Sequence, residues 1–181
     1  MNKRIIELIA IIFAMSSLIG CTKSTDNRLI FEDATELVAD VKSRVESIDS
    51  TGLNELLESG QMFLLVDVRT REEHDAGYIP GSVLIPRGLL EFRILNDEFW
   101  DEEGLYPPLK DELIILYCRS GNRSALAAES LEKLGFSNVY TLTGGFNGWK
   151  DSHPDMIEIN LPPVNPGLVN PATEDDSGSS C

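Results

Sequence analysis

Two short, almost purely apolar segments stand out in the chain, residues 62–68 (MFLLVDV) and 113–117 (LIILY). Apolar residues at consecutive positions over such a length are typical of strands that are buried on both faces of a sheet. Residues 83–85, bounded by prolines and a glycine, and residues 139–142 are predicted to be two further strands.

Between these strands, apolar residues recur at spacings of three and four, which predicts helices. One such stripe runs through residues 31–48, where Asp33 or Thr35 is expected to begin the helix. Residues 101–108, rich in acid and proline, are expected to be a loop. Strands that alternate with helices predict an α/β domain whose mainly parallel central sheet is flanked by helices on both faces. The other helices are predicted over residues 53–59, 88–100, 124–134 and 146–150.

The N-terminus has a different pattern, a short basic start at Lys3 and Arg4 and then a mostly apolar run to residue 19. This run is shorter than the ~20 apolar residues of a spanning helix, and it indicates a secretory signal. Residues 18–21 (LIGC) resemble the lipobox of bacterial lipoproteins, which implies cleavage before Cys21 and lipidation of its thiol. An ordinary signal peptide or an N-terminal anchor is the alternative.

The chain is therefore divided into a signal peptide (residues 1–20), a polar tether (21–30), one domain (31–155) and a tail (156–181). The tail is proline-rich and then acidic and serine-rich, and its part beyond Pro162 is expected to be mobile. The lipobox implies a membrane partner and a lipid-anchored place in the bacterial cell envelope. This place would be on the periplasmic side, at the outer membrane if the cell has one.

Charge narrows the class of partners. The 181 residues carry a formal net charge of −15, with 42% hydrophobic residues and a pI of about 4.4. Such a surface repels nucleic acid, and no basic stripe offsets it, so no nucleic-acid partner is expected. An anionic substrate would need a local positive field.

A candidate site follows the second buried strand, where the sequence CRSGNRS leads into a predicted helix. A turn from a strand into a helix points backbone N–H groups inward, and the helix N-terminus adds partial positive charge. A cysteine in that field, with two arginines beside it, should have a lowered pKa. The serine at the end of the turn is expected to cap the helix. The residues concerned are Cys118, Arg119, Ser120, Gly121, Asn122, Arg123 and Ser124.

The sequence has three cysteines, of which Cys21 belongs to the lipobox. Only Cys118 and Cys181 could then form a disulfide, and an internal thiol left free outside the cytoplasm would need a functional reason. The plain alternative is an inert, buried cysteine at the end of a strand. No metal site is expected, because no paired histidines and no second cysteine lie near Cys118.

The loop resembles the active-site loop of single-domain rhodaneses, a family of sulfurtransferases. The resemblance extends from about residue 48 to residue 150, in the order expected for the family. It includes the family's upstream signature in residues 66–74 (VDVRTREEH) and 77–82 (GYIPGS), and its C-terminal signature in residues 142–149 (LTGGFNGW). The chain departs from many relatives at two positions. It has Tyr78 where they carry histidine, and it has His74 where they often carry an aromatic residue, so His74 is expected to serve in packing.

This resemblance implies a rhodanese-like fold and a cysteine, Cys118, that takes sulfane sulfur from a donor such as thiosulfate. The persulfide would then pass its sulfur to a thiol or another thiophilic acceptor, without a cofactor. The amides of residues 119–123 would hold the outer sulfur. Asp67 and Arg69, at the end of the neighbouring strand, are expected to support the loop as an ion pair rather than to take part in the chemistry.

Three other functions stay open. Related cysteine phosphatases have five residues between the cysteine and the arginine, whereas four separate Cys118 from Arg123, which disfavours phosphatase or arsenate reductase activity. A sulfur carrier without turnover would use the same cysteine. A thiol–disulfide protein would pair Cys118 with Cys181, although the sequence has no Cys-x-x-Cys motif.

Overall fold

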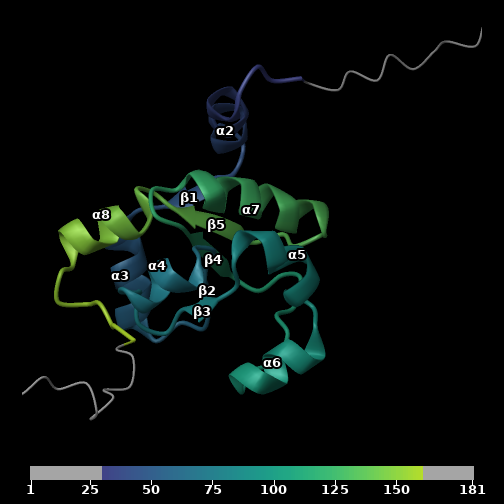
Figure 1. The fold of residues 1–181 in the computed structure, drawn as a ribbon. Coiled ribbons are helices and arrows are strands. Elements are labelled where there is room, and N and C mark those ends of the chain that lie inside the picture. Colours follow the sequence, from purple (N-terminus) through teal and green to yellow (C-terminus); the bar gives the residue numbers. More distant parts are fainter. Residues whose placement is uncertain (1–29, 161–181) are drawn as a thin grey trace, which may run out of the picture. The chain divides into compact units, whose positions relative to one another are not determined.

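The computed structural model describes residues 30–160 of the chain (Figure 1). Its strands form one five-stranded sheet in the order β1-β5-β4-β2-β3, and each neighbouring pair of strands is parallel. The predicted α/β class is therefore confirmed. The strands are β1 (Glu46–Ile48), β2 (Leu64–Asp67), β3 (Val83–Leu84), β4 (Ile114–Tyr117) and β5 (Val139–Leu142).

Helices cover both faces of the sheet, because alternate residues of a strand point to opposite faces. In β4, Ile114 and Leu116 pack into a core cluster with α2, α5, α6 and α7, whereas Ile115 and Tyr117 pack into a second cluster with α3 and α8. The helices are α2 (Ala34–Lys42), α3 (Ser50–Ser59), α4 (Arg71–Asp75), the short 3₁₀ helix η2 (Arg87–Leu89), α5 (Leu90–Arg93), α6 (Asp97–Glu103), α7 (Asn122–Lys133) and α8 (Gly145–Ser152).

The single helix predicted over residues 31–48 is wrong in its second half. Helix α2 begins as expected after Asp33, whose carboxylate accepts the N–H groups of Thr35 and Glu36 at 2.7 and 2.9 Å. The chain leaves the helix after Lys42 and forms strand β1 beside β5. Val45 and the end of this strand continue the helical spacing of apolar residues, so the periodicity alone could not separate strand from helix.

The helix predicted over residues 88–100 is divided. A 3₁₀ turn and α5 end before Asn96, whose side chain accepts the N–H of Phe99 at 2.7 Å and begins a second helix, α6. This helix continues to Glu103, into the predicted loop 101–108, and ends where Gly104 takes a left-handed φ of 70°. The helix boundaries therefore differ from the predicted ones because the Asn96 side chain begins a new helix within the apolar stripe of residues 88–100.

The domain extends beyond the predicted boundary at residue 155. Glu158 and Tyr78 exchange two backbone hydrogen bonds of 2.8 and 3.0 Å, and the Asn160 N–H donates to the Asp75 carbonyl at 3.1 Å. Met156 and Ile157 pack against the core cluster of α3 and α8. The first five residues of the predicted tail are thus attached to the domain by an apolar contact and a β-bridge.

Several sequence-based predictions concern residues outside the described range. They are the signal peptide, lipidation of Cys21, the tether before Ile30, the tail from residue 161 onward and a disulfide to Cys181. Within residues 30–160, none of the helices combines the length and the apolar character needed to cross a membrane.

Candidate active site

The cysteine sulfur lies in a cradle of backbone amides at the carboxyl end of β4. Cys118 follows this strand directly and is 1% exposed, and Gly121 turns the chain into α7 with a left-handed φ of 88°. The turn brings the Gly121 N–H to 3.2 Å from Sγ, and the Ser124 hydroxyl lies 3.9 Å from Sγ. Glycine suits this position because a side chain would strain the left-handed backbone.

This environment favours the thiolate. Burial by itself would raise the pKa of Cys118. Hydrogen bonds from the backbone of Ser124 and Ser120, from the Ser124 hydroxyl and from the Gly121 amide outweigh this effect, so the pKa lies below its ordinary value. The N-terminus of α7 points at the sulfur and adds to the same effect. The cradle can therefore hold a negatively charged sulfur without a histidine base.

Ser124 does not cap the helix, contrary to the sequence-based prediction. Helix α7 begins two residues earlier, at Asn122, and its N-cap is Gly121, which has no side chain to offer. Ser124 is fully buried in the first turn, and its hydroxyl is directed at the cysteine sulfur instead of a helix amide. Its contact with Sγ makes it part of the cradle.

The cradle keeps its shape because a second helix N-terminus holds the outer side of the loop. The N–H groups of Phe146 and Asn147, at the start of α8, donate to the carbonyls of Cys118 and Arg119 at 2.7 and 3.0 Å. Gly145 makes this approach possible, since a Cβ there would overlap the Cys118 carbonyl oxygen and lie 2.9 Å from the Gly121 nitrogen. With the carbonyls held outward, the loop amides face inward.

The two arginines of the loop differ. The Arg119 side chain is exposed and makes no hydrogen bond or ion pair with any residue from 30 to 160. Arg123 makes a bidentate ion pair with Glu73 of α4, with both N–O distances 2.7 Å. Glu73 and the Cys118 sulfur both raise the pKa of the Arg123 guanidinium. Asn122 accepts a hydrogen bond of 2.7 Å from Lys42 of α2.

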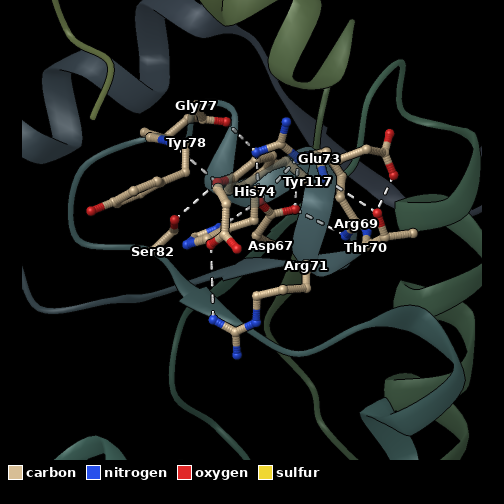
Figure 2. Close-up of polar contacts among 12 residues, drawn as sticks. Asp67, Arg69, Thr70, Arg71, Glu73, His74, Gly77, Tyr78, Ser82 and Tyr117 are labelled. Carbon is tan, nitrogen blue, oxygen red and sulfur yellow. Dashed lines mark hydrogen bonds and ion pairs between the residues drawn. The ribbon is translucent and has the colours of Figure 1, made fainter. Parts of the chain in front are cut away.

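Asp67 and Arg69 form a buried ion pair, as the sequence analysis expects (Figure 2). The Arg69 guanidinium donates to both Asp67 carboxylate oxygens at 2.7–3.0 Å and to the Gly77 carbonyl at 2.7 Å. It also lies over the Phe146 ring, 4.1 Å from the centroid. The pair therefore links the end of β2 to the start of α8, and so supports the cradle from behind.

His74 does more than pack. Its Nδ1 lies 2.9 Å from an Asp67 carboxylate oxygen, and its ring stacks on Tyr78 with centroids 4.2 Å apart (Figure 2). The Tyr117 hydroxyl accepts the Ile79 N–H at 3.2 Å. Burial raises the pKa of Tyr117 above its ordinary value, so the phenol stays protonated.

Comparison with known proteins agrees with this geometry. The family model of the rhodanese-like domain matches residues 50–152. The chain belongs to the rhodanese-like domain family. It is 34% identical over 131 residues to the probable adenylyltransferase/sulfurtransferase MoeZ of Mycobacterium tuberculosis, a match over 70% of this chain and 31% of MoeZ. The chain thus spans about a third of that relative.

Two further proteins match more of their own length. The human thiosulfate:glutathione sulfurtransferase is 37% identical over 101 residues, which are 54% of this chain and 86% of the human protein. A solved structure from Rhodopseudomonas palustris, described as a protein of unknown function and possible tyrosine phosphatase, superposes with a TM-score of 0.57 at 29% identity. That match covers 69% of this chain and 94% of the other.

Sequence reasoning missed three parts of this rhodanese-like site, namely Glu73, Lys42 and the backbone contacts of Gly145. The spacing Thr70-x-x-Glu73 is a capping-box signal that could have placed Glu73 at the start of a helix. Nothing in the local sequence indicates its partner Arg123, 50 residues away. The role of Gly145 in holding the cradle depends on the fold, because its close contacts are with the distant residues Cys118, Arg119 and Gly121.

We predict that Asp67→Asn destabilises the rhodanese-like domain in a pH-dependent way. Burial by itself would raise the pKa of Asp67. Hydrogen bonds from His74 and Arg69 outweigh this effect, so the pKa in the folded protein lies below the unfolded value of ~3.9. The charged carboxylate therefore adds stability above the unfolded pKa, and this stability is lost as the pH falls through the folded pKa.

Urea unfolding at pH 7 should show a loss of about 3 kcal/mol, because Arg69 stays buried without its partner. The difference between wild type and variant should shrink as the pH falls below 4. Asp151→Asn removes an exposed carboxylate and should change stability little at either pH. A difference for Asp67→Asn that stays constant with pH would contradict this interpretation.

Proposed function

We propose that the protein is a sulfurtransferase that carries sulfane sulfur as a persulfide on Cys118. The observation that carries the proposal is the buried thiol with a lowered pKa, surrounded by inward-facing amides. With thiosulfate, the Cys118 thiolate would attack the outer sulfur. The S–S bond of the donor breaks, and sulfite leaves with the bonding electron pair.

The same cradle suits the second half of the reaction. The outer sulfur of the persulfide is anionic, and amides that point inward stabilise such a charge as an oxyanion hole does. A nucleophilic acceptor, such as a thiol or cyanide, attacks the outer sulfur and releases the Cys118 thiolate. The names of two relatives, a probable adenylyltransferase/sulfurtransferase and a thiosulfate:glutathione sulfurtransferase, support this class of reaction.

Phosphatase activity fits this site less well. The loop from Cys118 to Arg123 has four intervening residues, and its amides close on a single sulfur atom rather than on a tetrahedral anion. The arginine that would bind a phosphate is paired with Glu73. The test is hydrolysis of p-nitrophenyl phosphate, for which no turnover is expected.

Turnover separates an enzyme from a carrier that only holds sulfur. The protein is expected to form thiocyanate from thiosulfate and cyanide continuously, with sulfite released in equal amount. A single equivalent of sulfite without continued thiocyanate formation would indicate a carrier. Absence of both products would contradict the proposed function. A disulfide to Cys181, the basis of the thiol–disulfide alternative, would appear as a mass deficit in the unreduced protein.

We also propose that the protein works as a lipoprotein of the bacterial cell envelope, anchored through Cys21. Residues 18–21 carry this proposal, and two or more acyl chains anchor a protein stably where one does not. Cys21→Ser should therefore abolish fatty-acid labelling and move the protein out of the membrane fraction. Labelled, membrane-bound protein in that variant would contradict the anchor without affecting the proposed sulfur chemistry.

A further inference from the structure

The ion pair between Glu73 and Arg123 has consequences for the donors that the site accepts. Both side chains are partly exposed, 30% for Glu73 and 36% for Arg123, so a molecule that approaches the cradle meets them. The pairing is bidentate, which is the strongest geometry that a guanidinium and a carboxylate can form. Arg123 lies in the first turn of α7 next to Ser124, whose hydroxyl is 3.9 Å from the Cys118 sulfur, so the pair lies near the reacting atom.

Glu73 is itself held in place. Its carboxylate accepts the Thr70 N–H at 3.2 Å, and its own N–H donates to the Thr70 hydroxyl at 3.3 Å, a capping box at the start of α4 (Figure 2). The pair with Arg123 lowers the pKa of Glu73, so the carboxylate is charged at neutral pH. A negative charge is thus fixed at the rim of a site that would accept anions.

We propose that Glu73 selects sulfur donors by charge: it occupies Arg123 and thereby disfavours small dianionic donors, such as thiosulfate, relative to donors of lower charge. The inference rests on the proposed sulfurtransferase function and names the residue that sets its donor preference. Glu73 acts through Arg123 and is a positioning residue, with no part in the transfer of sulfur.

The physical reason is competition for the guanidinium of Arg123. To bind Arg123, the oxygens of a dianionic donor must displace the Glu73 carboxylate, which then stays unpaired beside the incoming charge. Arg69, which lies over the Phe146 ring at the start of α8, is already bound to Asp67 and cannot replace Arg123. A donor with an organic group and a single charge loses less binding affinity, because its binding depends less on the Arg123 guanidinium and it is repelled less by Glu73.

Glu73→Gln tests this with little structural change. Glutamine supports a capping box as glutamate does, so α4 should keep its first turn, while the guanidinium of Arg123 loses its counter-charge. Glu72→Gln is the matched control, since it removes the same charge from the same turn at an exposed position without contact to Arg123. Any effect of net charge alone appears in both variants.

The first readout is alkylation of Cys118 by iodoacetate, which is anionic, and by iodoacetamide, which is neutral, followed at the peptide that contains Cys118. The ratio of the two rates cancels the thiolate fraction and requires no sulfur transfer. Glu73→Gln should raise the iodoacetate/iodoacetamide ratio about tenfold, as loss of a nearby charge in a partly solvated site does. Glu72→Gln should change this ratio less than about twofold. An unchanged ratio, or equal changes in both variants, would overturn the proposal.

The second readout is kcat/KM with thiosulfate divided by kcat/KM with benzenethiosulfonate, a singly charged donor. Glu73→Gln should raise this quotient about tenfold by the same electrostatic argument. If the alkylation ratio rises while the donor quotient stays constant, selection of donors by Glu73 is wrong. If no donor transfers sulfur, the proposed function fails, whereas the alkylation ratio still reports the effect of Glu73 on anions.

Discussion

Cys118→Ser is expected to reduce sulfur transfer by a factor on the order of 10⁴ or more, which in practice is its loss. The serine hydroxyl fits the space of the thiol, but it ionises far too weakly for the amides around Cys118 to produce an anion that attacks sulfur. The measurement is thiocyanate formation from thiosulfate and cyanide, with the far-UV circular dichroism and urea midpoint of each protein as controls.

The fold should survive this change, because the backbone hydrogen bonds that hold the loop against the start of α8 do not involve the side chain of residue 118. The carbonyls of Cys118 and Arg119 keep their bonds to the start of α8. Ser124→Ala is a useful companion, since it removes only the hydroxyl contact to Sγ and should slow transfer while keeping it measurable. Full transfer by a folded Cys118→Ser protein would show that the sulfur is carried elsewhere.

Gly145→Ala is expected to cause the largest structural effect of a single methyl group in the site. The added Cβ would overlap the Cys118 carbonyl and crowd the Gly121 nitrogen, so the cradle and the start of α8 must separate. The cost combines the strain of a left-handed backbone, about 1–2 kcal/mol, with overpacking of roughly 2–3 kcal/mol. Urea unfolding measures the sum, and the pH dependence of Cys118 alkylation should show a raised pKa.

Gly60→Ala is the matched control for this prediction. Gly60 has a similar φ of 71°, but a Cβ there has no atom within 4 Å, so the substitution adds backbone strain without a clash. It should lower stability by about 1–2 kcal/mol and leave the alkylation profile of Cys118 unchanged. If the two alanine variants lose equal stability and react alike, the close contact of Gly145 does not maintain the cradle.

The sequence was informative where a local pattern has one structural outcome. The segment 113–117 is apolar at every position, and it forms the central strand β4. The glycine, the serines and the apolar helix after Cys118 place the loop between a strand and a helix N-terminus. Asp67 and Arg69 lie two residues apart at a strand end, so their pairing could be expected.

Other features depend on contacts between distant segments, and no local pattern reports them. Strand β1 has three residues and gains its pairing from β5, more than 90 residues later. In the sequence, residues 156–160 resemble the polar tail that follows them. Only the β-bridge with Tyr78, a distant residue, shows that they belong to the domain. The restraint of Arg123 by Glu73 also arises only from the fold, because the two residues are 50 positions apart in the sequence.

The intact mass of the protein after incubation with thiosulfate, with excess donor removed, tests most directly whether Cys118 carries sulfur. A gain of one sulfur atom is expected in the wild type, located at the peptide with Cys118, reversed by cyanide, and absent from Cys118→Ser. An unchanged mass in the wild type, or the same gain in Cys118→Ser, would contradict it.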